Sequence, residues 1–208
     1  MNMDQRSDKV GITIETYDKI VDYYVRTHQH FDFWDEEYKQ FGRIAKRAGK
    51  MLDVGCGPGF DEEYFSPKGF EVTGIDLSEK MLIEAERRSP KSTFIKMDIR
   101  KLAFPDSSFD YLWCCASILH VPRGEIGETL KGFARVLKGN GIMFLATKKG
   151  TGEDMRSYPD GSERYFVYYQ RVELEDLLHE SGFDILESHE KVESNKDTWL
   201  VFFCKKKG

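Results

Sequence analysis

The chain has 208 residues, of which 40% are hydrophobic and 32% charged, as is typical of one globular domain with a sizeable core. Its formal net charge of -5 argues against a broad basic surface for nucleic acid. No segment approaches the roughly 20 consecutive apolar residues that a membrane-spanning helix requires. The polar start, residues 1–9, does not resemble a secretory signal, so we expect a cytoplasmic protein. Its four cysteines form no Cys-x-x-Cys pair, so we expect no metal site.

Residues 1–48 are rich in aromatic and charged side chains. Apolar residues recur there at helical spacing, at Tyr17, Ile20, Val21 and Tyr24. This pattern predicts one or two helices, which we expect to form an N-terminal cap.

Residues 49–147 alternate short apolar runs with amphipathic segments, which predicts repeated βα units and a parallel sheet. We expect helices at 61–67 and at 125–137. A further helix should begin after a capping serine at 78. The predicted strands are 50–54, 71–75, 93–97, 109–114 and 142–147.

Residues 148–208 depart from this repeat. An irregular stretch, 148–170, precedes a predicted helix at 172–181. Two strands at 184–189 and 198–204 flank a polar connection, which favours an antiparallel hairpin. We therefore expect one domain over 1–208, a Rossmann-like doubly wound α/β sheet that is mostly parallel with an antiparallel C-terminal strand. Its parts are the helical cap, a cofactor-binding core at 49–147 and a substrate-side region at 148–208.

A glycine-rich loop, Asp-Val-Gly-Cys-Gly-Pro-Gly at 53–59, follows the first predicted strand. Glycines allow close approach of backbone amides to a ligand, so the loop predicts a nucleotide-type cofactor site. Carboxylates stand at the ends of three predicted strands. Asp76 can accept from ribose hydroxyls, Asp98 from an adenine amino group, and Asp53 can orient the loop amides or meet a cationic amino group.

The spacing of the glycines separates two classes of cofactor. A dinucleotide loop would need a glycine at position 60, where this chain has Phe60. No Lys-Ser/Thr pair follows, which excludes a P-loop. A cofactor without phosphate but with an amino-acid tail suits this acid-flanked loop better.

Five segments, in order, resemble the class I S-adenosylmethionine-dependent methyltransferases of the ubiquinone/menaquinone-biosynthesis-like group (methyltransferase types 11 and 25). They are 52–60, 72–77, 98–110, 116–121 and 135–141. The resemblance implies S-adenosyl-L-methionine as cofactor, S-adenosyl-L-homocysteine as product, and a set of contacts. These are Gly55, Cys56 and Gly57 around the methionine part, Asp76 at the ribose, Leu77 and Met81 beside the adenine, Asp98 and Ile99 at the adenine edge, Ala116 near the sulfonium, and Tyr17 and Tyr24 closing over the cofactor.

His120 follows the fourth predicted strand, near the expected site of methyl transfer. It is a candidate catalytic base, although a structural role is an alternative. On the substrate side, Tyr165, Tyr168 and Tyr169 either face the acceptor or belong to the core. Lys148, Lys149 and Arg156 either contact an anionic acceptor or are solvated, and the sequence alone leaves this open.

These features favour in-line methyl transfer to a small-molecule acceptor, by a monomer or homodimer. The alternatives are a tRNA- or RNA-modifying methyltransferase, a non-catalytic cofactor-binding protein, and a nicotinamide-dependent dehydrogenase. The acidic composition counts against the RNA alternative, because phosphate contacts dominate nucleic-acid affinity.

Overall fold

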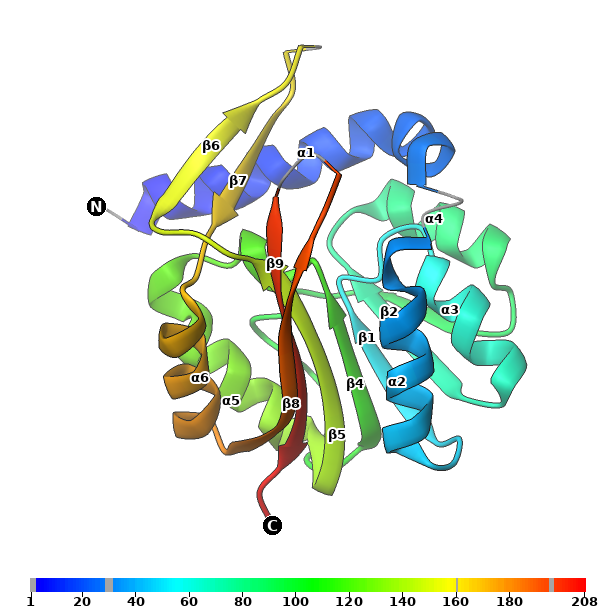
Figure 1. Cartoon of the computed structure of the whole chain (residues 1–208). Helices are drawn as coiled ribbons and strands as arrows, with labels where there is room; N and C mark the ends of the chain where they lie inside the picture. The colour runs from blue at the N-terminus through cyan, green and yellow to red at the C-terminus, as the bar shows by residue number, and fades with distance from the viewer. Residues whose placement is uncertain (1–2, 29–31, 160, 195–196) are drawn as a thin grey trace.

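A computed structural model of the chain describes residues 3–28, 32–159, 161–194 and 197–208. In this part of the chain, one central sheet has seven strands in the order β3-β2-β1-β4-β5-β9-β8 (Figure 1). Strand β9 runs antiparallel to both its neighbours, while the remaining pairs are parallel. The predicted α/β class and the antiparallel C-terminal strand are confirmed. The strands are β1 (Lys50–Val54), β2 (Glu71–Asp76), β3 (Thr93–Lys96), β4 (Phe109–Cys115), β5 (Leu137–Lys148), β8 (Phe183–Val192) and β9 (Thr198–Lys206).

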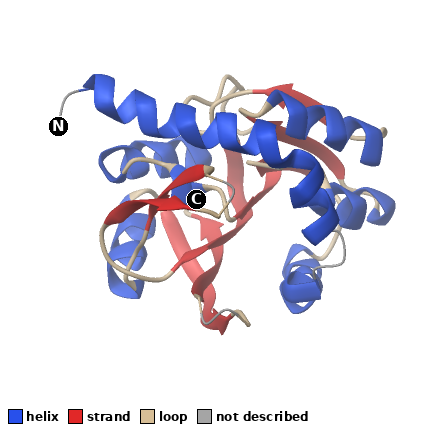
Figure 2. Cartoon of the chain, turned by 90° about the horizontal axis from the view of Figure 1, so that it is seen from above, coloured by secondary structure: helices blue, strands red, loops and turns tan. Residues whose placement is uncertain are grey.

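Helices cover both faces of the sheet, and a long N-terminal helix crosses the carboxyl ends of its strands (Figures 1 and 2). Ser78 caps α4 as expected, since its hydroxyl accepts from the Met81 amide at 3.2 Å. None of the helices in the described residues has the length and apolar character needed to cross a bilayer. The helices are α1 (Met3–His28), α2 (Asp35–Ala45), α3 (Phe60–Phe65), α4 (Glu79–Arg88), α5 (Ile126–Val136) and α6 (Arg171–Glu180), with short 3-10 turns at 32–34, 66–68, 118–120 and 123–125.

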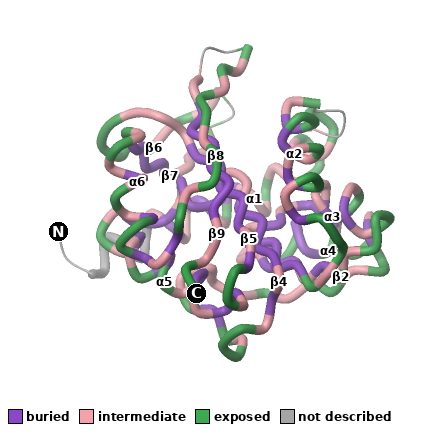
Figure 3. The backbone as a smooth tube through the Cα atoms, turned by 60° about the horizontal axis from the view of Figure 1, so that its bottom comes forward, coloured by how far each residue is buried: buried purple, intermediate pink, exposed green. Residues whose placement is uncertain are grey.

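Alternation along the central strands builds two cores. On β4, Leu112 and Cys114 pack toward α5 and α6, whereas Tyr111 and Trp113 pack toward α2 and α3. Because both faces of the sheet are covered, the sequences of its central strands are nearly continuous apolar runs. Figure 3 shows this burial along β4, β5 and β9. Helices thus cover the two faces of the sheet, and a site can form at the carboxyl ends of its strands.

The structure differs from the sequence prediction in residues 148–170. A separate two-stranded hairpin, β6 (Glu153–Ser157) and β7 (Glu163–Val167), forms there instead of an irregular stretch. The hairpin is held by α1. The Thr16 hydroxyl donates to the Glu163 carbonyl at 2.7 Å, and the Tyr165 amide donates to the Thr13 hydroxyl at 2.9 Å. Together α1 and the hairpin stand over the carboxyl edge of the sheet (Figure 1).

Candidate functional site

The glycine loop leaves β1 and is fastened to the end of β2. The amides of Gly55 and Cys56 both donate to the Ile75 carbonyl, at 2.8 and 3.0 Å. Gly55 has a φ of 77°, and a Cβ there would lie 2.4 Å from Cβ of Ser117. Gly57 has a φ of 53°, and no atom lies within 4 Å of where its Cβ would be. Glycine is therefore required at 55 by packing, and at 57 it leaves space beside the backbone for a ligand.

Asp76, the last residue of β2, completes this loop. Its carboxylate accepts from the amides of Gly57 at 3.0 Å and Ser78 at 2.8 Å. Burial raises the pKa of Asp76, and these backbone donors oppose the rise. The loop and the carboxylate thus fix each other in position.

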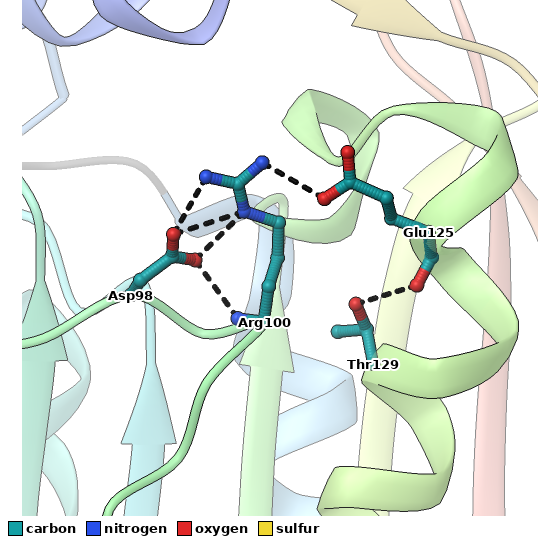
Figure 4. A network of polar contacts seen from close by, with 4 residues as sticks. All are labelled: Asp98, Arg100, Glu125 and Thr129. Carbon is teal, nitrogen blue, oxygen red and sulfur yellow. Dashed lines mark hydrogen bonds and ion pairs between the residues drawn. The ribbon is translucent and has the colours of Figure 1, made fainter. Parts of the chain in front are cut away.

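Asp98 follows β3 and is held by Arg100, as Figure 4 shows. The Arg100 guanidinium donates to both Asp98 oxygens, at distances from 2.6 to 3.0 Å, and its other end donates to Glu125 at 2.9 Å. Burial alone would raise the pKa of Asp98, but the Arg100 hydrogen bonds bring it below its ordinary value. Asp98 is therefore an ionised acceptor in a fixed orientation.

Most predicted cofactor-binding residues converge on a first cavity of about 130 Å³ between the glycine loop and α1. A second, larger cavity of about 530 Å³ adjoins it and adds Cys56. The two cavities share Tyr17, Tyr24, Gly55, Gly57, Cys115 and Ala116. The predicted residues on the first cavity are Tyr17, Tyr24, Gly55, Gly57, Asp76, Leu77, Met81, Asp98, Ile99, Ala116 and His120.

Asp53 is placed differently from the expectation. It is 1% exposed and lines neither of these cavities. Burial and the neighbouring Glu62 carboxyl raise the pKa of Asp53 well above its usual range. Side-chain alternation along β1 puts Asp53 on the same face of the sheet as Met51, toward α2 and α3, where Glu62 of α3 is its neighbour.

His120, in the 3-10 turn after β4, links α1 to the hairpin. Its Nδ1 lies 2.5 Å from the Tyr165 carbonyl, and its Nε2 lies 2.9 Å from the Tyr17 hydroxyl. Because a carbonyl can only accept, Nδ1 carries the hydrogen and Nε2 accepts from Tyr17. Burial lowers the pKa of His120 to about 4, so the ring is neutral with both nitrogens engaged. This geometry gives His120 a positioning role toward Tyr17.

The predicted substrate-side tyrosines do not line these two cavities. Tyr165 and Tyr169 are almost fully buried, and the Tyr165 hydroxyl donates to Glu153 at 2.5 Å. Tyr168 is 8% exposed, and its hydroxyl donates to Asp154 at 3.1 Å. On β7, alternate side chains face opposite ways, so the second cavity receives the intervening residues, Arg164 and Phe166.

The second cavity also contains residues that the sequence analysis did not single out. Aromatic rings come from Trp34, Tyr38, Phe166 and Trp199, and a cation comes from Arg164. Lys148 and Arg156, whose roles the sequence left open, lie on the same cavity. The signal that could have identified Arg164 and Phe166 is the two-residue alternation of 163–167, once that segment is recognised as a strand.

Comparisons with known proteins identify the family of the chain. Residues 52–145 match the family described as "Methyltransferase domain". A ubiquinone biosynthesis O-methyltransferase of Rhodopseudomonas palustris is 31% identical over 173 residues, which cover 74% of this chain and 67% of that protein. A malonyl-[acyl-carrier protein] O-methyltransferase of Erwinia billingiae is 38% identical over 104 residues, or 50% of this chain and 41% of that protein.

Among solved structures, 1,6-didemethyltoxoflavin-N1-methyltransferase of Burkholderia thailandensis superposes with a TM-score of 0.80. The match covers 97% of this chain and 90% of that one. Because the identity is only 17%, the match supports the fold alone. This chain spans at most about half the length of the first curated relatives, namely 49, 40 and 40%. The matched segments, the strand order and the glycine loop show that the chain belongs to the class I S-adenosylmethionine-dependent methyltransferases.

Proposed function

We propose that this protein transfers the methyl group of S-adenosylmethionine to a small-molecule acceptor held in the second cavity. The observation that carries the proposal is the junction of the two cavities at Gly55, Gly57 and Ala116. A cofactor bound in the first cavity would reach the acceptor at this junction. Ala116 has a φ of 56°, an unfavourable value for a residue with a side chain, and such strain clusters at functional sites.

The residues of the first cavity fit this cofactor. Asp76 would bind the ribose hydroxyls with lone pairs left over from its two backbone donors. Asp98 would accept from the adenine amino group, between Leu77 and Ile99. The open space beside Gly57 would admit the amino-acid tail, since a side chain there would fill it.

When bound, the cofactor supplies an electrophilic methyl group on a cationic sulfonium. The chain's own contribution is to hold the acceptor in line and to exclude water. The ring of Tyr17 packs edge-on against that of Tyr24 at 5.8 Å, and both border the junction. Their electron-rich faces favour a cation there. His120 fixes Tyr17 by its hydrogen bond.

The second cavity supports a small acceptor. The Trp34 and Trp199 rings meet edge-to-face at 5.3 Å on its lining, and Phe166 adds a third ring. Rings of this kind suit a compact apolar or aromatic molecule. Relatives are named for acceptors that include malonyl-[acyl-carrier protein] and 1,6-didemethyltoxoflavin, so the family's fold accommodates chemically different acceptors.

Calorimetry with S-adenosylhomocysteine, followed by transfer assays with methyl-labelled S-adenosylmethionine, tests the proposal. We expect the wild-type protein to bind S-adenosylhomocysteine and not NAD, and to label at least one small acid, phenol or amine. Absence of S-adenosylhomocysteine binding would refute the proposed cofactor. Binding without transfer to any acceptor would instead favour a non-catalytic cofactor-binding protein.

A further inference from the structure

The β6–β7 hairpin presents two arginines as a cross-strand pair. Arg156 and Arg164 are direct partners in the antiparallel register, and both line the second cavity. Like charges in such a pair are destabilising. A third cation, Lys148 of β5, joins them on the same lining. All three lie over the Phe166 ring, with charged groups 5.2, 5.7 and 5.5 Å from its centroid for Arg156, Arg164 and Lys148.

The acids near this cluster form ion pairs with two of its three cations. Asp197 pairs with Lys148 and, at 3.3 Å, with Arg156. Glu193 accepts from the Trp199 indole at 3.2 Å. In the described part of the chain, no carboxylate forms an ion pair with Arg164. A partly buried arginine without an ion-pair partner carries a desolvation cost, and an anionic ligand in the cavity would offset it.

The contacts of Arg164 leave donors available. One Nη donates to the Tyr17 hydroxyl at 3.3 Å, and the guanidinium lies over the Tyr158 ring at 4.1 Å. Its Nε is buried and has no hydrogen-bond partner among the described residues. A guanidinium presents Nε–H and Nη–H as a planar fork, which matches the two oxygens of a carboxylate.

We propose that Arg164 binds a carboxylate of the methyl acceptor, which is therefore an aromatic acid. This inference rests on the proposed function, because it places the acceptor in the second cavity. Arg164 lines the second cavity and not the first, and the acids Asp61 and Glu63, just after the glycine loop, line the same cavity without an ion pair to Arg164 among the described residues. The Trp34 and Trp199 rings provide the surface for the aromatic part.

The test is calorimetry on protein saturated with S-adenosylhomocysteine. Benzoate, salicylate and 4-hydroxybenzoate are titrated beside their neutral amides. We expect the wild type to bind at least one acid about tenfold more tightly than its amide, the difference typical of a charge-assisted pair. Arg164→Met should abolish this preference, and Arg164→Lys, which keeps the charge but not the fork, should reduce it. The control Arg87→Met, at an exposed arginine of α4, should retain it.

Several outcomes would overturn the assignment. They are equal affinity of the wild type for acids and amides, no binding of any acid at millimolar concentration, or a preference that survives in Arg164→Met. Weaker binding of S-adenosylhomocysteine by Arg164→Met would assign the arginine to the cofactor's carboxylate instead. A wild type that fails to bind S-adenosylhomocysteine refutes the proposed function itself, which separates the two failures. Arg164→Lys decides the question if Arg164→Met does not fold.

Discussion

The Tyr17 hydroxyl donates to Nε2 of His120 across 2.9 Å, and Nδ1 of the same ring donates to the Tyr165 carbonyl at 2.5 Å. One imidazole thus connects α1, the turn after β4, and β7. The ring is partly buried, and this burial lowers its pKa to about 4. A histidine in this state stabilises the arrangement around the cavities only while it is neutral.

Replacing His120 with asparagine should change how stability depends on pH. In the wild type, the unfolded chain binds a proton at this residue below about pH 6.5, whereas the folded chain excludes it until about pH 4. The free energy of unfolding therefore falls as the pH drops through this window, by up to about 3 kcal/mol from this residue. In His120→Asn that part of the fall should vanish.

Urea denaturation of both proteins at pH 7, 5.5 and 4 measures the difference. Carboxyl groups titrate in both proteins, so the comparison isolates His120. Parallel stability curves would mean that His120 titrates normally in the folded protein and is not held neutral.

Asp76→Asn should weaken binding of S-adenosylhomocysteine by about 10- to 100-fold, as expected when a charge-assisted acceptor is lost. The amide has one acceptor oxygen, so it cannot serve both the Gly57 and Ser78 amides and the ribose. Calorimetry gives the affinity, and Asp184→Asn, an exposed aspartate on β8, is the matched control. Equal affinities in the two variants would remove Asp76 from the cofactor site.

Asp98→Ala should remove discrimination at the adenine edge. Arg100 keeps this carboxylate ionised and oriented, so it favours a ligand with an exocyclic amino donor (Figure 4). S-inosylhomocysteine carries an oxygen at that position and should bind the wild type about tenfold less tightly than S-adenosylhomocysteine. Asp98→Ala should bind the two ligands alike. If the variant still discriminates as strongly as the wild type, another group reads the adenine.

The sheet and the glycine loop were predictable because their signals are local. The apolar run at 50–54, the glycines after it, and Asp76 at the next strand end lie in one short stretch, and the structure places them as predicted. The hairpin was not predictable in this way, because long-range contacts such as Thr16 with Glu163 stabilise it. Its glycines and proline resemble an ordinary loop in sequence.

The side chains that face the second cavity were also not predictable from the sequence alone. Tyr165 and Phe166 are adjacent, and composition alone cannot say which of them faces the cavity. The strand register decides it, and a shift of one residue exchanges the two faces. In the observed register, Arg164 and Phe166 line the second cavity. Tyr165 points to the other face, where its hydroxyl donates to Glu153. Asp53 is a different case: its position two residues before Gly55 predicted a contact with the loop amides or with a cationic amino group, whereas its buried side chain lines neither cavity.

Gly57→Val should abolish detectable binding of S-adenosylhomocysteine. A valine would fill the space beside the loop that no protein atom occupies, and it would force a β-branched residue to a φ of 53°. Gly132→Ala is the control, because Gly132 lies in α5, has open space around it, and should bind the ligand normally while gaining up to about 1 kcal/mol of stability. Calorimetry and urea denaturation on both variants separate lost binding from lost folding. A folded Gly57→Val protein with wild-type affinity would show that the cofactor does not approach the backbone at this loop, which would contradict the proposed site.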